Sequence, residues 1–259
     1  MHFHGTRSYN RYMTTTYTRH LPIEGTHNFR DSGGYPTRDG SSVRWRTLFR
    51  SDSHHELTES GKQAIYDLGI RTSIDLRAEH ESQSSPSVFA SSETIAYRQL
   101  PLKATGSDTR APRANDLSEL NRMFLDSGHD SFSTILHSMA EDRTFPVVIS
   151  CAVGKDRTGL MVALLLELAG VHRDDVIEDY ALTAKHAGKR IEQIAAMALA
   201  DGRDPAQFAR LMECRPETMA QSLAYLDNQH GGAERYVSKI GLSHATIATL
   251  REALVGHSP

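Results

Sequence analysis

The sequence predicts an α/β fold, with a central and mostly parallel β-sheet flanked by helices. Residues 147–149 are apolar and β-branched, which is typical of a strand covered on both faces. Residues 157–169 follow closely and are apolar almost all round, so they predict a buried helix that ends near Gly170. Upstream, residues 72–76 alternate as a second strand does. Strand, turn and helix in this order favour a sheet whose strands run parallel.

The composition indicates a soluble globular protein. The chain has 259 residues, of which 39% are hydrophobic and 24% charged, which is enough for a sizeable core. The net charge of -3 gives no reason to expect nucleic acid or an anionic membrane as a partner. No apolar run reaches the roughly 18 residues of a membrane span, and no signal-peptide core is visible. We expect a cytoplasmic monomer, and export without a visible signal stays open.

The N-terminal half predicts short strands and turns around one helix. Residues 1–18 are polar and predict a flexible arm, in which His2 and His4 lack a third metal ligand nearby. A single domain is expected over residues 19–259, without a cofactor or a metal. A turn at Asp39-Gly40 predicts a hairpin. The next helix is expected to begin after Thr58, its N-cap, and to end near Gly69.

The middle of the chain predicts a short helix and loop over residues 78–92 and a strand over residues 95–99. Residues 103–115 read as a loop, and helices are expected after Asp116 and from Asp130.

The C-terminal part predicts helices only. Asp174 is expected to cap the first, residues 183–230 are expected to be helical with breaks, and Ser243 is expected to cap the last.

Chemistry is concentrated in the turn after residues 147–149. Cys151 opens this turn at the carboxyl end of the strand, where open α/β sheets place their ligands. Backbone amides that converge on a helix N-terminus form an anion site, and a thiol placed there is favoured as a thiolate nucleophile. Arg157 begins the helix, where its planar guanidinium can hold two phosphate oxygens. Gly154 permits a tight turn, and Thr158 can donate its hydroxyl to the sulfur. This pattern predicts phosphoryl transfer through a cysteinyl-phosphate.

The same residues resemble a known family. Cys151 to Arg157 fits the Cys-x5-Arg signature of the protein-tyrosine phosphatases, and Cys-Ala-Val-Gly-Lys-Asp-Arg-Thr-Gly is similar to a bacterial atypical branch with Lys and Asp inside the loop. Upstream, Asn-Phe-Arg-Asp-Ser-Gly-Gly-Tyr at residues 28–35, later followed by Ile-Asp-Leu-Arg at residues 74–77, resembles the N-terminal half of that branch. Together the matches cover roughly residues 20 to 185.

The resemblance implies a cysteine-phosphatase-like fold whose C-terminal helices, about residues 183–230, lie over the active site. It implies that Cys151 is the nucleophile, that Asp156 is the general acid and that Arg157 holds the phosphoryl group, without a metal. The residues expected to bind substrate alongside them are Ala152, Val153, Gly154, Lys155 and Thr158. The expected substrates are phosphotyrosine proteins, with phosphoserine, phosphothreonine and phosphoinositides as further candidates. Lys155 either binds a second phosphate of a phosphoinositide or is a solvated lysine.

Several assignments have alternatives. Asp156 can hold the loop instead of acting as the acid, and Asp108 or Asp116 can be an acid on a mobile loop. Asp75 is either an acid or loop-orienting residue, or part of a buried salt bridge or helix cap. Arg50 either faces the active site or forms a structural ion pair with an aspartate.

Three rival functions stay open. Ser150 stands where the family usually has a histidine, so a pseudophosphatase that binds phosphate without turnover is one alternative. A thiol redox enzyme built on Cys151 and Cys214 is another, although the two lack Cys-x-x-Cys spacing and Cys214 alone is more simply structural. The third is a phosphatase of a small sugar or inositol phosphate.

Overall fold

The computed structural model describes residues 17–104, 114–200, 202 and 204–256. His2, His4 and Asp108 lie outside these residues. Within them, a central sheet has the strand order β1-β3-β6-β4-β5, and a second, small sheet pairs β2 with β7. The strands are β1 (Arg30–Asp31), β2 (Ser42–Val43), β3 (Leu48–Ser51), β4 (Thr72–Asp75), β5 (Ala96–Gln99), β6 (Val147–Ser150) and β7 (Val255–Gly256).

The central sheet is mostly parallel, which confirms the predicted fold class. Strands β3, β4, β5 and β6 run parallel, and only the edge strand β1 pairs antiparallel with its neighbour β3. The register places Ser150 opposite Ser51 on one side and opposite Asp75 on the other, so three strands end together beside the cysteine turn.

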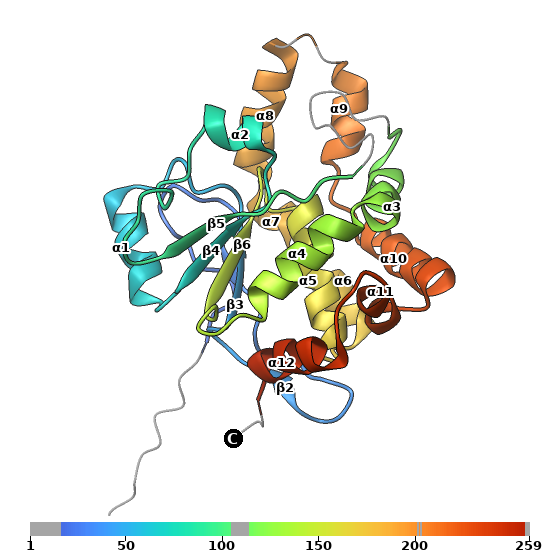
Figure 1. Cartoon of the computed structure of the whole chain (residues 1–259). Coiled ribbons are helices and arrows are strands. Elements are labelled where there is room, and N and C mark those ends of the chain that lie inside the picture. The colour runs from blue at the N-terminus through green and yellow to red at the C-terminus, as the bar shows by residue number, and fades with distance from the viewer. Residues whose placement is uncertain (1–16, 105–113, 201, 203, 257–259) are drawn as a thin grey trace, which may run out of the picture.

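Helices cover both faces of this sheet (Figure 1). They are α1 (Glu59–Asp67), α2 (Glu79–Ser84), α3 (Leu117–Ser127), α4 (His129–Met139), α5 (Asp156–Leu168), α6 (Arg173–Ala181), α7 (Thr183–His186), α8 (Gly188–Ala200), α9 (Pro205–Met212), α10 (Pro216–Tyr225), α11 (Ala233–Lys239) and α12 (His244–Leu254), with a π-helix at Leu226–His230. None of the helices described is long and apolar enough to cross a membrane.

Strand β6 is buried on both faces, as its sequence predicts. Val147 and Ile149 belong to a large core that also holds α4 and α5, whereas Val148 packs with Ile65 of α1 in a smaller core. Helix α5 is buried along nearly its whole length. The strand that precedes Cys151 is therefore packed between two hydrophobic cores, and this packing fixes the position at which the following turn begins.

The helix caps follow local chemistry. Thr58, Asp116 and Ser243 each accept a hydrogen bond from a backbone N–H of the helix that they precede, as expected. One cap differs from the prediction: His172 is the N-cap of α6, and Asp174 lies in the first turn, where its charge still favours the helix N-terminus.

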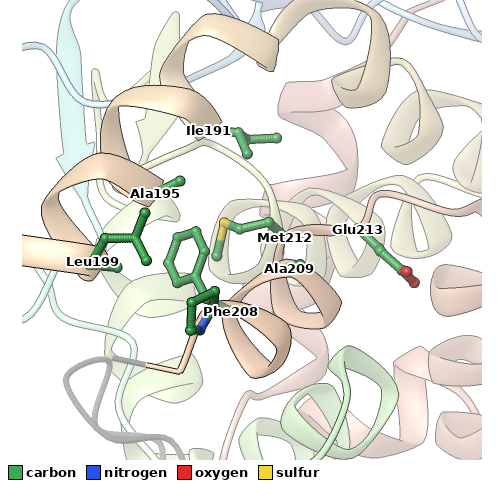
Figure 2. Close-up of a pocket in the computed structure, with 9 residues that line it drawn as sticks. Ile191, Ala195, Leu199, Phe208, Ala209, Met212 and Glu213 are labelled. Atoms are coloured by element: carbon green, nitrogen blue, oxygen red, sulfur yellow. The ribbon is translucent and has the colours of Figure 1, made fainter. Parts of the chain in front are cut away.

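Helices α8 and α9 stand side by side at one end of the molecule, with α2 at the same end (Figure 1). Between them lies a pocket of about 390 Å³ (Figure 2). Its lining is almost wholly apolar and includes Ile191, Leu199, Phe208 and Met212. Residues 183–230 are helical, as predicted, with breaks around Gly202 and before Pro216. Whether residues 19–259 form a single domain stays a prediction.

His54 is a buried histidine that makes stability depend on pH. It lies between Phe29 and Phe89, its Nδ1 is 3.4 Å from the Ser73 hydroxyl, and its Nε2 has no hydrogen-bond partner among the residues described. Burial lowers the pKa of His54 to about 4, from 6.5. The unfolded chain therefore takes up this proton near pH 6.5 while the folded protein does not, so stability is lost as the pH falls below 6.5.

We expect His54→Phe to flatten this dependence, because the apolar ring does not titrate. Between pH 6.5 and about 4, the wild type should lose about 3 kcal/mol more of its free energy of unfolding than the variant does. Urea unfolding at several pH values measures the difference. The exposed His244 supplies the control, His244→Phe, whose pH profile should match that of the wild type. Parallel profiles for wild type and His54→Phe would contradict this assignment.

Candidate active site

Cys151 lies where the sequence places it, directly after β6 and shortly before α5. It is 3% exposed, and the turn that it opens is largely buried. Gly154 has a φ of +70°, a conformation that favours glycine. A Cβ at Gly154 would lie 2.3 Å from the Ser51 carbonyl oxygen, so a side chain does not fit there. The turn is therefore packed tightly against the end of the neighbouring strand β3.

Three side chains hold the carbonyl groups of this turn (residues 151–157), which we call the phosphate-binding loop after the role expected from the sequence. Arg190 Nε donates to the Ala152 carbonyl at 3.1 Å. Asn28 Nδ2 donates to the Val153 carbonyl at 2.9 Å and to the Gly154 carbonyl at 3.2 Å. A second donor to Gly154, at 2.8 Å, is Nη2 of Arg50.

These contacts orient the loop amides. In a planar trans peptide, the carbonyl of one residue and the N–H of the next point in opposite directions. Because the carbonyls of residues 152–154 are held from outside, the N–H groups of residues 153–155 point to the other side. None of these N–H groups donates to an acceptor in the described part of the chain. Converging amides at a helix N-terminus are what an oxyanion site requires.

Arg157 is held beside the loop by Glu81 of α2. Its Nη1 is 2.6 Å from Glu81 Oε2 and its Nη2 is 3.0 Å from Oε1, so the pair is bidentate. Burial opposes the charge of both groups, yet the two charges outweigh it: the pKa of Glu81 is lowered and that of Arg157 is raised. Both side chains are largely buried. The guanidinium is therefore fixed as a cation at the start of α5.

Asp179 anchors the two buried arginines behind the loop. Its Oδ2 is 2.5 Å from Arg50 Nη1, and its Oδ1 is 3.7 Å from Arg30 Nε. Burial alone would raise the pKa of Asp179, but Arg50 and then Arg30 lower it below its usual value. Arg50 thus forms the structural ion pair that the sequence left open, and it touches the loop from the carbonyl side.

Lys155 differs from the sequence interpretation that made it a solvated lysine. Its side chain is fully buried, and Nζ donates to the carbonyls of Leu211 at 2.6 Å and Glu213 at 3.1 Å. These carbonyls lie at the C-terminal end of α9, where a cation is favoured. Nζ is also 3.3 Å from Asp156 Oδ1. In this structure the ammonium therefore binds α9 and the neighbouring carboxylate.

Asp156 and Thr158 occupy the first turn of α5. The Asp156 side chain is 18% exposed, and its Oδ1 is buried, 3.3 Å from Lys155 Nζ. The Thr158 hydroxyl is buried and has no hydrogen-bond partner among the residues described. Its expected bond to the Cys151 sulfur is not formed here.

The remaining candidates have structural partners. Asp75 forms a buried ion pair with Arg77, with Oδ2 2.6 Å from Nη2, and accepts from the Tyr97 hydroxyl at 3.0 Å. This is the buried salt bridge that the sequence left open for Asp75. Asp116 is an N-cap. Cys214 donates to the Tyr180 carbonyl at 3.6 Å, and burial raises the pKa of its thiol.

Three functional contacts were missed from the sequence: those of Glu81, Asp179 and Arg190. Glu81 lies in a charged, Ser-rich stretch that predicts surface, and the only local signal was its place in the first turn of a helix. Asp179 is a charged residue on helix α6, and charged helix residues ordinarily face solvent. Arg190 lies on a helix with little other burial. No group of three or more potential metal ligands occurs in the described residues.

A buried cysteine after a parallel strand, loop N–H groups without acceptors among the described residues and an arginine fixed at a helix N-terminus are the features expected of a cysteine-dependent phosphatase. The chain belongs to the tyrosine phosphatase family, whose model matches residues 21–256. A tyrosine-protein phosphatase of Nostoc commune is 30% identical over 76% of this chain and 70% of its own length. The triple specificity protein phosphatase PtpB of Mycobacterium tuberculosis is 26% identical over 92% of this chain and 99% of its own. Together these relationships make the chain a protein-tyrosine phosphatase.

Proposed function

We propose that the chain hydrolyses phosphomonoesters through a cysteinyl-phosphate at Cys151, with phosphotyrosine proteins as its main substrates. The observation that carries this proposal is the orientation of the phosphate-binding loop, whose carbonyls are held outside by Asn28, Arg50 and Arg190. The amides are thereby free for an oxyanion beside Cys151. Arg157, fixed by Glu81, supplies the positive charge that a phosphoryl group needs.

The reaction has two displacement steps. The Cys151 thiolate attacks phosphorus, so that an S–P bond forms while the P–O bond to the leaving group breaks. Asp156, in its protonated form, gives its proton to the leaving oxygen. In the second step the Asp156 carboxylate takes a proton from water, the resulting oxygen attacks phosphorus, and the S–P bond breaks to release phosphate and restore the thiolate. The amides of the loop and Arg157 hold the other phosphoryl oxygens throughout.

The substrate range extends, in this proposal, beyond phosphotyrosine to phosphoserine, phosphothreonine and phosphoinositides. The name of the Mycobacterium tuberculosis relative, a triple specificity protein phosphatase, supports more than one class of substrate. The apolar pocket between α8 and α9 lies near the loop. Glu213 lines this pocket, and the Glu213 carbonyl accepts a hydrogen bond from Lys155 of the loop. Such a pocket can accept the apolar part of a leaving group.

Phosphate release tests this function. The wild type should be assayed with a phosphotyrosine peptide, a phosphoserine peptide and a phosphoinositide, each in the presence of a metal chelator. We expect chelator-resistant release that is fastest from phosphotyrosine. Tight phosphate binding without release from any of the three would overturn the proposal and favour a pseudophosphatase, since Ser150, directly before the loop, stands where the family usually has a histidine.

Lys155→Ala tests the role of the loop lysine. Because the ammonium is buried against the carbonyls of Leu211 and Glu213, we expect its loss to lower phosphotyrosine and phosphoinositide turnover by the same factor. The lost charged hydrogen bonds should also cost about 2 kcal/mol in free energy of unfolding. Steady-state kinetics on both substrates, with urea unfolding, measure these effects. A selective loss of phosphoinositide turnover would show instead that Lys155 leaves α9 to bind a second phosphate.

A further inference from the structure

We propose that Arg190 of α8 is a positioning residue of the phosphate-binding loop, which fixes the peptide between Ala152 and Val153 and so aims the Val153 N–H at the bound phosphoryl group. The inference rests on the proposed function of this loop and deepens it, because it makes the helix pair α8 and α9 part of the phosphate site.

The burial of Arg190 is the first observation. Within α8, only Arg190 and Ala198 are buried, and the preceding Lys189 is exposed. The Arg190 side chain is 7% exposed. Taking a guanidinium out of water is costly unless its donors find acceptors. Helix α8 exposes its other cation, Lys189, but buries Arg190, which indicates a specific role for Arg190.

The contacts of Arg190 show that use. Nε donates to the Ala152 carbonyl at 3.1 Å, Nη2 to the Ser53 hydroxyl at 3.2 Å, and Nη1 to Gln193 Oε1 at 2.9 Å, while Glu56 Oε1 lies 3.7 Å from Nη1. Gln193 lies one turn further along α8, and Ser53 follows β3. Each of the three guanidinium nitrogens thus has an acceptor. The bonds of Nη1 and Nη2 fix the plane of the guanidinium, and this plane sets the direction in which Nε donates to the loop.

Arg190 completes a set of three supports. Asn28 and Arg50, from the N-terminal part of the chain, hold the carbonyls of Val153 and Gly154, and only the first peptide of the series depends on α8. Without Arg190 this peptide is free to rotate, and the Val153 N–H then no longer points toward the anion. The Lys155 ammonium ties the other end of the loop to α9, which stands beside α8 (Figure 1).

Oxyanion binding by the intact chain tests the proposal. We would compare the wild type with Arg190→Met, which keeps the apolar stem, Arg190→Lys, which restores one donor, and the control Lys189→Met on the exposed face of the same helix. The readouts are the dissociation constant of orthovanadate, a phosphate mimic, by calorimetry, and kcat and KM on a phosphotyrosine peptide. We expect Arg190→Met to weaken orthovanadate binding about tenfold and to raise KM more than it lowers kcat. Arg190→Lys should be intermediate, and Lys189→Met should match the wild type.

An unchanged orthovanadate affinity in folded Arg190→Met would overturn the proposal. Thermal unfolding shows whether Arg190→Met is folded. If it is not, Arg190→Lys decides the question, because wild-type orthovanadate affinity in Arg190→Lys would equally contradict the role proposed for the Arg190 guanidinium. The outcome is separate from that of the proposed function. A wild type that binds orthovanadate but releases no phosphate would refute the function, while the orthovanadate comparison would still decide the role of Arg190.

Discussion

Replacing Cys151 with serine is expected to lower kcat/KM on a phosphotyrosine peptide by roughly 10⁴-fold or more. A serine hydroxyl is close to the thiol in size but is not ionised near neutral pH, so the nucleophile is lost while the loop keeps its shape. The amides and Arg157, which bind the phosphoryl oxygens in our proposal, are unchanged. We therefore expect Cys151→Ser to bind orthovanadate and phosphopeptide, which calorimetry can measure. The variant should also unfold at nearly the same temperature as the wild type.

The second cysteine gives a matched control. Cys214 is partly buried, and its thiol donates to the Tyr180 carbonyl. Cys214→Ser should retain activity close to that of the wild type. If Cys151→Ser remained active, or if Cys214→Ser lost activity to the same extent, the nucleophile would be misassigned and a mechanism that uses both cysteines would gain support.

Arg157→Lys is expected to have the next largest effect, a loss of roughly 10³-fold in kcat/KM. Lysine keeps the positive charge but lacks the planar fork, so it cannot pair with both oxygens of Glu81 and hold two phosphoryl oxygens. The negative charge of the Glu81 carboxylate would then be less fully neutralised and would repel the bound phosphate. Steady-state kinetics measure the loss, and orthovanadate affinity should fall with it.

Arg173 offers a control for the same substitution elsewhere. It also makes a two-nitrogen contact with a carboxylate, that of Asp227, but on α6 and partly exposed. Arg173→Lys should leave kcat/KM unchanged, because surface ion pairs contribute little and this one does not touch the loop. A loss of similar size in both variants would indicate a general effect on stability and would count against a special role for Arg157.

The fold was predictable from the sequence because its signals are local. Apolar β-branched residues in β6, the all-round apolar pattern of α5 and the cap at Thr58 each depend on neighbours within a few positions. The positions of Cys151 and Arg157 were predictable for the same reason, since the turn and helix start place them without help from distant residues.

The supports of the site were not predictable in this way. Glu81 and Arg157, or Arg190 and Ala152, come from different elements, and no period or spacing in the sequence pairs them. A charged residue in an amphipathic helix such as α8 ordinarily faces solvent, so its burial becomes visible only once the helices are placed. Lys155 illustrates the same limit: its position in the loop is fixed locally, but its direction is set by carbonyls at the end of α9.

The most direct test of the account is to trap the covalent intermediate. The protein would be mixed with a phosphotyrosine peptide, quenched in acid within the first turnover, digested and analysed by mass spectrometry. We predict the added mass of one phosphoryl group on the peptide that contains Cys151, and more of it in Asp156→Ala, in which hydrolysis of the intermediate is slowed. Rapid phosphate release from the wild type with Cys151 unmodified at every quench time, or a phosphoryl group found on another residue, would contradict the cysteinyl-phosphate mechanism.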